Sequence, residues 1–213
     1  YMIKAIAERA GYKVGLIGTI RNLIGDRVIE TERTTPESAD LQRILREMKN
    51  DGVELVVMEV SSHSLDQHRV HGIDYDVGVF TNLTHDHLDY HKTFENYLAA
   101  KKKLFAQSHR AVVNADDPHF DMIVKDIGIP VTTFGIRENA DFSATEIEIT
   151  PRGVQFDMHE YSTEMRLNIG IPGLFSVFNA LLLRPVDVRQ PEQLVQLSGI
   201  YRNGGRVPLS YPM

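Results

Sequence analysis

The chain of 213 residues has no cysteine and no tryptophan. Without cysteine it can form no disulfide, no thiolate zinc site and no cysteine nucleophile. It also lacks any apolar run near the roughly 20 residues that a membrane-spanning helix needs, so no membrane span and no membrane partner are expected. Acidic residues outnumber basic ones, with a net charge of −6, and there is a single basic block at Lys101 to Lys103. This balance argues against a nucleic-acid partner.

Apolar runs alternate with helix-period segments over the first two-thirds of the chain. Four runs read as strands buried on both faces: 13–19, 55–60, 77–80 and 111–114. One expected helix ends at Gly11, and a second begins with Thr35 as its N-cap and Pro36 in first position. This alternation predicts an α/β fold with a doubly wound, mostly parallel sheet. The chain begins at Tyr1 in what reads as the middle of a helix, so the natural protein is expected to start earlier.

The pattern changes from about residue 131. Residues 142–149 and 153–158 alternate in polarity with few helical signals, as in an antiparallel hairpin that turns at Pro151-Arg152-Gly153. We therefore expect a small antiparallel β appendage at about 131–170, attached to the parallel sheet. With 42% apolar residues, the chain can form one medium domain or one and a half.

A histidine cluster follows the expected strand 77–80. His85, His87 and His91 stand with Asp86 and Asp89 within seven residues, and six of the nine histidines lie between residues 63 and 91. In open α/β sheets, ligands bind outside the carboxyl ends of the strands. The cluster therefore favours metal or phosphate chemistry over a polar loop with chance histidines.

Lys101 lies at an unusual position for a charged residue in the next expected helix, whose expected N-cap is Thr93. At about 100° per residue, Lys101 lies near the centre of the apolar stripe, whereas Lys102 and Lys103 project away from it. Such a lysine can extend its stem to water, pair with a carboxylate, or exist as a neutral amine with a lowered pKa. A neutral amine can capture carbon dioxide as a carbamate, which would be an anionic oxygen ligand suited to magnesium.

Glu59 ends the otherwise apolar strand 55–60. A carboxylate buried in the sheet is unfavourable unless it contacts a cation or a hydrogen-bond donor, and a bound metal ion would be such a cation. Ser61, Gln67 and Arg69 follow within ten residues. Two neutral hydrogen-bonding groups and one guanidinium suit an anionic ligand with sugar or amide groups. The alternative is that Ser61 caps a helix and the others lie on the surface.

The motifs occur in an order that resembles the central ATPase domain of the Mur ligase family, over about residues 1–181. The resemblance implies a P-loop-like central domain at 1–183, followed by an atypical tail of unknown structure at 184–213. The matching segments are Met58-Glu59-Val60-Ser61-Ser62-His63, Gln67-His68-Arg69-Val70, Phe80-Thr81-Asn82-Leu83, Asp86-His87-Leu88-Asp89-Tyr90-His91 and Ala99-Ala100-Lys101.

The resemblance also implies roles for single residues. It makes Glu59 and His87 magnesium ligands, makes Lys101 the carbamylated lysine that helps to organise a second magnesium ion, and places Asn179 near the adenine of ATP. His63, His85 and His91 receive no role, beyond orienting other ligands. The residues implied to touch the UDP-muramoyl substrate are Thr34, Thr35, Ser61, Gln67 and Arg69.

The function implied is that of an ATP-dependent ligase of peptidoglycan precursor synthesis in the cytoplasm. Such an enzyme adds the third stem residue, diaminopimelate or lysine, to UDP-N-acetylmuramoyl-L-alanyl-D-glutamate through an acyl phosphate. The chain departs from the family in three respects: it contains no glycine-rich phosphate loop, Arg33 stands where asparagine is usual, and Pro185 would break a helix that the family continues. We expect flanking N- and C-terminal domains in the parent protein, and no ligation by this chain alone.

Two other functions stay open. One is a non-catalytic module that binds a nucleotide or a UDP-sugar, favoured by the lack of a phosphate loop in the sequence. The other is a two-metal hydrolase, because residues 84–91 nearly spell the Thr-His-x-His-x-Asp-His signature of metallo-β-lactamase-fold enzymes. One extra residue before the last histidine spoils that match, and the signature leaves Glu59 and Lys101 unexplained.

Overall fold

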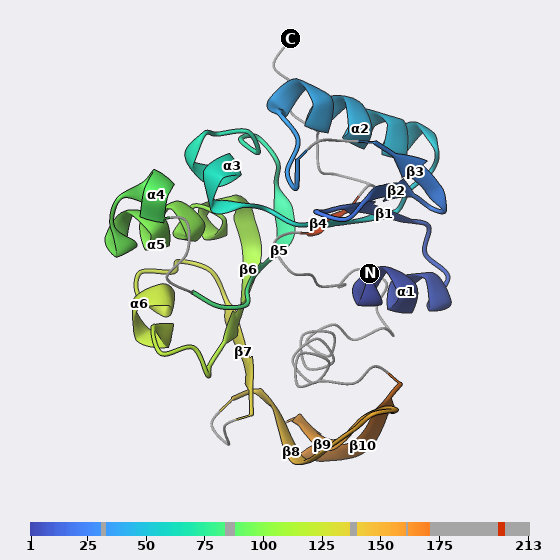
Figure 1. Cartoon of the computed structure of the whole chain (residues 1–213), viewed down its shortest axis with the longest axis vertical. Helices are drawn as coiled ribbons and strands as arrows, with labels where there is room; N and C mark the ends of the chain where they lie inside the picture. The colour runs from blue at the N-terminus through green and yellow to red at the C-terminus, as the bar shows by residue number, and fades with distance from the viewer. Residues whose placement is uncertain (31–32, 84–87, 137–139, 161, 171–199, 203–213) are drawn as a thin grey trace.

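Figure 1 shows the computed structural model of the chain, which describes residues 1–30, 33–83, 88–136, 140–160, 162–170 and 200–202. Its helical segments are α1 (Met2–Arg9), α2 (Ser38–Asn50), α3 (Ser62–Asp66), α4 (Leu88–His91), α5 (Phe94–Lys102), η1 (Phe105–Gln107) and α6 (Phe120–Val124). Its strands are β1 (Val14–Ile17), β2 (Asn22–Ile24), β3 (Arg27–Ile29), β4 (Leu55–Met58), β5 (Tyr75–Phe80), β6 (Ser108–Asn114), β7 (Val131–Gly135), β8 (Phe142–Thr150), β9 (Gly153–Glu160), β10 (Thr163–Ile169) and β11 (Ile200–Arg202).

The strands form one sheet in the order β10-β9-β8-β7-β6-β5-β11-β4-β1-β2-β3. Strands β5 to β8 pair in parallel, and so do β1 and β4. The short strand β11 pairs antiparallel with both β4 and β5, so these two also run in the same direction. The centre is thus parallel except for β11 and is flanked by antiparallel strands at both edges, which confirms the predicted α/β fold and its antiparallel appendage.

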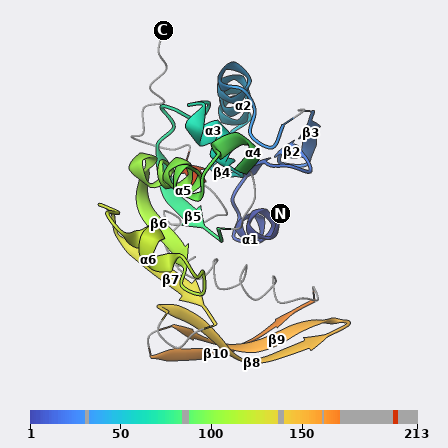
Figure 2. The same ribbon diagram turned by 60° about the vertical axis from the view of Figure 1, so that its left-hand side comes forward.

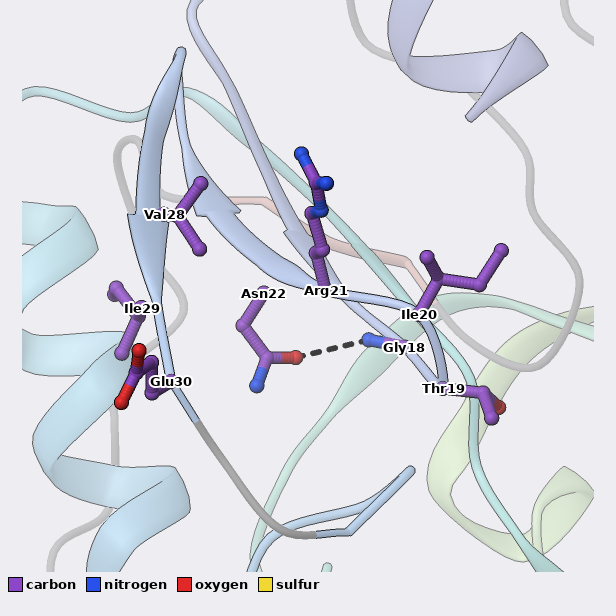
Figure 3. Close-up of a pocket in the computed structure, with 8 residues that line it drawn as sticks. All are labelled: Gly18, Thr19, Ile20, Arg21, Asn22, Val28, Ile29 and Glu30. Atoms are coloured by element: carbon purple, nitrogen blue, oxygen red, sulfur yellow. Dashed lines mark hydrogen bonds between the residues drawn. The ribbon is translucent and has the colours of Figure 1, made fainter.

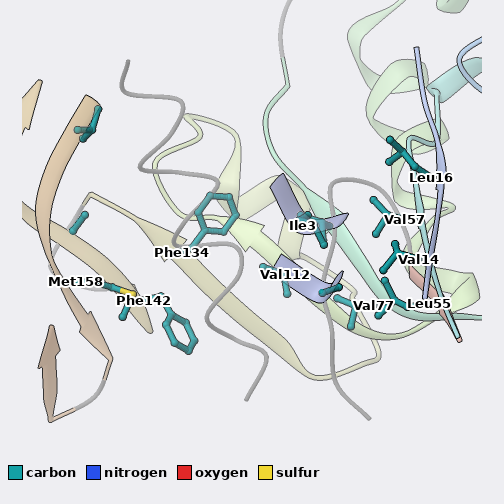
Figure 4. Close-up of a cluster of buried hydrophobic side chains, with 14 of the residues drawn as sticks. Ile3, Val14, Leu16, Leu55, Val57, Val77, Val112, Phe134, Phe142 and Met158 are labelled. Carbon is teal, nitrogen blue, oxygen red and sulfur yellow. The ribbon is translucent and has the colours of Figure 1, made fainter. Parts of the chain in front are cut away.

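Alternate residues of the central strands face two different layers of helices. Val14 and Leu16 of β1 and Val57 of β4 pack with Ile3 of α1 on one face (Figure 4). Ile17, Val56 and Met58 contact the apolar side of α2 on the opposite face, where that helix buries Leu41, Ile44, Leu45 and Met48. In Figure 1, α1 and α2 accordingly lie on opposite sides of β1 and β4. This arrangement is what a doubly wound sheet requires.

The antiparallel appendage consists of β8, β9 and β10, which form a long curved ribbon away from the helices (Figure 2). Strands β8 and β9 turn where predicted, with Thr150 opposite Gly153. Gly153 has a φ of 152°, and a Cβ there would lie 2.1 Å from the carbonyl oxygen of Ile169, so only glycine fits. Strand β7, at the start of the β-rich part, still belongs to the parallel sheet because it pairs with β6.

Three local expectations differ from the structure. Helix α2 begins at Ser38 with Glu37 as N-cap, so the prediction of Thr35 as N-cap is wrong. The reason is that the buried hydroxyl of Thr35 bonds to the segment after β4 instead. The hairpin of β2 and β3 was not predicted, nor was β11, which lies in the tail. Among the described residues, no helix is long and apolar enough to cross a membrane.

Candidate functional site

The carboxyl ends of β1, β4, β5 and β6 meet at one edge of the sheet, because these four strands run in the same direction. Polar residues follow each of these ends: Thr19 after β1, Glu59 after β4, Asn82 after β5 and Asp117 after β6. Ligands of open α/β sheets bind at such an edge. This edge carries the predicted site residues that the structure describes.

Glu59 lies half-buried directly after β4. Its Oε2 accepts hydrogen bonds from the backbone N–H of Thr19, at 3.0 Å, and from the Thr19 hydroxyl, at 2.6 Å. A Cβ on Gly18 would come within 3.1 Å of the Glu59 carboxyl carbon, so the backbone after β1 closely approaches this side chain. Both bonds use Oε2, and among the described residues no donor bonds to Oε1, so this oxygen could accept a bond from a ligand.

Thr35 and Ser61 lie beside Glu59 and fix the backbone around it. The buried Thr35 hydroxyl donates to the Glu59 carbonyl oxygen at 2.9 Å and accepts from the Ser61 N–H at 3.0 Å. Ser61 is the N-cap of α3, where its hydroxyl accepts from the N–H of Ser64. Ser61 therefore has the capping role that the alternative interpretation gave it, and it also lies next to Glu59.

Arg69 joins this group through its guanidinium and is only 8% exposed. It donates to the carbonyl oxygen of Thr35 at 3.2 Å, and its Nε donates to Oε1 of Gln67 at 2.8 Å. The carboxylate of Glu37 lies 3.4 Å from the same Nε and pairs with Arg33 at 3.0 Å. The structure thus brings Thr35, Gln67 and Arg69 together.

Thr19 connects the remaining predicted threonine to Glu59, because its hydroxyl lies 3.1 Å from the hydroxyl of Thr34. Thr19 also lines a pocket of about 510 Å³ formed by residues 18–22 and 28–30 (Figure 3). Within it, the buried side chain of Asn22 accepts a hydrogen bond from the N–H of Gly18 at 3.0 Å. Thr19 and this pocket were missed from the sequence, although a threonine just after a strand end was a usable signal.

Lys101 lies on α5, whose N-cap is Thr93 as predicted, with the Thr93 hydroxyl accepting from the Asn96 N–H. The Lys101 ammonium lies 5.1 Å from the ring centre of Phe80 and 5.3 Å from that of Tyr97. It donates to the carbonyl oxygen of Asn82 at 3.3 Å. Burial lowers the pKa of Lys101, an effect that the charge of Asp117 partly offsets.

The neighbouring lysines point elsewhere, as the helical wheel predicted. Lys102 donates to the carbonyl oxygens of Met122 and Lys125, and Lys103 pairs with Asp66 at 2.7 Å. Helix α5 ends at Lys102, however, so the apolar residues 104 and 105 belong to the following turn and to η1.

Two of the histidines pack inside the helical layer. His91 is buried and its Nε2 lies 2.9 Å from the Ser62 hydroxyl, while the ring of His63 lies 4.2 Å from the ring of Tyr90. His85, the predicted metal ligand His87 and the predicted adenine neighbour Asn179 lie outside the described residues. Within the described part of the chain, no three His, Cys, Asp or Glu side chains gather as a metal site.

The fold is an α/β domain with polar groups at the carboxyl ends of its parallel strands, which is where ligands bind in open α/β sheets. Residues 1–183 match the Mur ligase middle domain. Because that match covers most of the chain, the chain belongs to the Mur ligase middle domain family.

The relatives that match are named as ligases of a UDP-N-acetylmuramoyl peptide. Over 181 residues the chain is 50% identical to UDP-N-acetylmuramoyl-L-alanyl-D-glutamate–2,6-diaminopimelate ligase 1 of Clostridium acetobutylicum, covering 85% of this chain and 38% of the relative. A solved UDP-N-acetylmuramoyl-L-alanyl-D-glutamate–2,6-diaminopimelate ligase matches with a TM-score of 0.78 and 27% identity, over 93% of this chain and 44% of that one. The chain therefore spans well under half the length of the relatives it matches.

A third match supports the fold alone. The MurF ligase of Thermotoga maritima, solved in complex with ADP, has a TM-score of 0.59 and 17% identity, over 84% of this chain and 39% of that one. The ADP belongs to that structure, and it shows that this fold binds an adenine nucleotide in at least one neighbour.

Proposed function

We propose that this chain is the middle part of an ATP-dependent ligase that forms an amide on UDP-N-acetylmuramoyl-L-alanyl-D-glutamate. The observation that carries the proposal is the common edge at which Glu59, Thr34, Thr35 and Ser61 gather, with Lys101 of α5 bonded to the segment that follows β5. The names of the relatives favour diaminopimelate as the incoming amino acid. Family membership at 50% identity supports the same reaction class.

In this proposal the threonines, Ser61, Gln67 and Arg69 hold the UDP-muramoyl peptide. Hydroxyl, amide and guanidinium groups suit the amide and carboxylate oxygens of that substrate. Arg69 is fixed by Thr35 and Gln67 before any ligand binds, so little conformational freedom is lost when the substrate carboxylate docks. A substrate oriented in this way presents one carboxylate for reaction.

The lowered pKa of Lys101 supports a second role. A neutral Lys101 amine adds to carbon dioxide, forms an N–C bond and releases one proton, which leaves an anionic carbamate. Such a carbamate, the available oxygen of Glu59 and the His87 imidazole would be suitable magnesium ligands. ATP with magnesium supplies, when bound, the phosphoryl group that converts the substrate carboxylate into an acyl phosphate. Asn179 would lie near the adenine.

The test uses the full-length product of the reading frame that encodes this chain. With ATP, magnesium, the UDP-muramoyl dipeptide and either diaminopimelate or lysine, we expect ADP and an amide product, identified by mass. The isolated 213-residue chain is expected to give no product under the same conditions. Binding of the UDP-muramoyl dipeptide by the full-length protein without turnover would instead support a non-catalytic binding module.

A further inference from the structure

A chain of polar side chains runs from Lys103 to Arg69 across α5, α4 and the end of α3. Lys103 pairs with Asp66 Oδ1 at 2.7 Å, and Asp66 Oδ2 lies 3.2 Å from the hydroxyl of Tyr90. The Tyr90 hydroxyl lies 3.2 Å from Nε2 of Gln67, whose Oε1 faces Arg69 at 2.8 Å. Nothing in the proposed reaction uses Tyr90, Asp66 or Lys103.

The two ends of this chain determine the direction of every hydrogen bond in it. Arg69 has only donors, so the Gln67 atom facing it must be the oxygen, and the Gln67 NH₂ group therefore faces Tyr90. The Tyr90 hydroxyl accepts one of these N–H bonds and must direct its own proton to Asp66. Lys103 lowers the pKa of Asp66, so that side chain is an ionised acceptor at neutral pH.

The ring of Tyr90 is held by packing as well as by hydrogen bonds. Its centre lies 4.2 Å from the ring of His63 and 4.8 Å from that of His91, and His91 is itself anchored on Ser62 at 2.9 Å. The position of the hydroxyl is therefore set from α3 and α4 independently of Gln67. Gln67, by contrast, is exposed, and without a partner on its NH₂ group its amide would be held only by the bonds from Arg69 to Oε1 among the described residues.

We propose that Tyr90 is a positioning residue for the UDP-muramoyl substrate, supported by Asp66 and Lys103. It holds the Gln67 amide so that Oε1 receives Arg69 and the second N–H of Nε2 is presented to a carboxylate or amide oxygen of the substrate. The inference rests on the proposed function for the identity of that substrate. The contacts between Tyr90, Gln67 and Arg69 do not depend on the proposed function.

The kinetic test compares Tyr90→Phe with Tyr12→Phe, because Tyr12 is also half-buried but packs near α1. In the full-length protein, Tyr90→Phe should raise the KM for the UDP-muramoyl dipeptide about three- to tenfold, as expected for the loss of one net hydrogen bond. The kcat and the KM for ATP should change less than twofold. Lys103→Met should raise the same KM about twofold because its ion pair is partly exposed, and Lys102→Met should not.

A double-mutant cycle separates positioning from general damage. If Tyr90 acts through Gln67, Tyr90→Phe adds no further loss in a Gln67→Ala background. An equal rise in the KM for the UDP-muramoyl dipeptide in both backgrounds, or a fall in kcat with an unchanged KM, would overturn the proposal.

A second measurement does not depend on activity. In the full-length protein, Tyr90→Phe should shift the Gln67 side-chain NH₂ signals in a nitrogen–proton correlation spectrum, and Tyr12→Phe should leave them in place. Unshifted signals would overturn the proposal even if ligation occurs. Shifted signals in a protein that performs no ligation would retain the positioning contact and reject the proposed function.

Discussion

The two parts of the carboxyl edge hold their candidate residues in opposite ways. Around Glu59, the polar groups are tied to one another: Thr19 bonds to the carboxylate, and Thr35 bonds to the backbone on both sides of Val60. Lys101 instead lies half-buried near two aromatic rings, and among the described residues it donates to one carbonyl oxygen. The first part is fixed by hydrogen bonds, and the second has few hydrogen-bond partners within the described part of the chain.

The difference suggests a division between binding and chemistry. Groups tied by several hydrogen bonds change position little and suit the recognition of a substrate, because their order is established before binding. A desolvated lysine is poised to lose its charge, since burial disfavours the ammonium form. Substitutions in the two parts should therefore differ in kind: near Thr35 they should cost stability, and at Lys101 they should cost activity alone.

The largest expected effect is that of Lys101→Ala on ligation. Loss of the amine removes the proposed carbamate, so kcat should fall about a hundred- to thousandfold, the cost of removing one group that stabilises charge in the reaction. The melting temperature should fall by no more than it does in Lys102→Ala, because Lys101 forms no ion pair with any described residue, whereas Lys102 bonds to two backbone carbonyls. Steady-state kinetics and thermal unfolding measure the two outcomes.

Lys102→Ala serves as the control for activity and should retain kcat within about twofold, the small effect typical of a surface change away from the site. Strong unfolding of Lys101→Ala, or full activity in that variant, would reject the division between binding and chemistry.

Thr35→Val should give the next largest effect, on stability. The methyl group fills the space of the hydroxyl but leaves the Glu59 carbonyl and the Ser61 N–H without their partner, which should cost about 1–3 kcal/mol of unfolding free energy. Urea denaturation measures this cost. Thr34→Val is the matched control, because among the described residues the half-buried Thr34 hydroxyl has a hydrogen bond with the exposed Thr19 alone, and its loss should cost about 0.5 kcal/mol or less. Equal costs in the two variants would contradict the picture of a fixed Glu59 side.

The sequence predicted the parts of this edge that depend on local pattern. The apolar runs placed β1, β4, β5 and β6, and the spacing from Thr93 placed Lys101 on its apolar face. The hairpin of β2 and β3 had a local signal too, since Gly25-Asp26 forms a two-residue loop in which Gly25 has a φ of 58°. The hairpin was not predicted because residues 13–19 were interpreted as one strand that a helix follows.

Other features depend on contacts between distant residues. Thr35 was expected to cap the next helix because Pro36 follows it, yet its hydroxyl bonds to residues 24 and 26 positions further along the chain. The pairing of β11 with β4 spans more than 140 residues, from Val57 to Ile200. The link from Arg69 through Tyr90 to Lys103 likewise needs three helices in place. No local spacing rule gives such contacts.

The smallest expected effect is a pH dependence of stability that Lys101 creates. Its pKa is lower in the folded protein than the usual value near 10.5, so between these two values the unfolded chain binds more protons than the folded one. The burial of the charged Lys101 therefore costs the most stability at pH values below the folded pKa. This cost decreases as the pH rises from the folded pKa to the unfolded one. Lys101→Met should raise the free energy of unfolding at pH 7 and flatten its increase from pH 7 to 10, whereas Lys102→Met should retain the slope of the unsubstituted protein. Urea titrations at a series of pH values, under carbon-dioxide-free buffer, measure this slope without interference from the carbamate. A slope unchanged by Lys101→Met would mean that the ammonium is as well solvated when folded as when unfolded, and the contrast with the Glu59 side would then rest on hydrogen bonding alone.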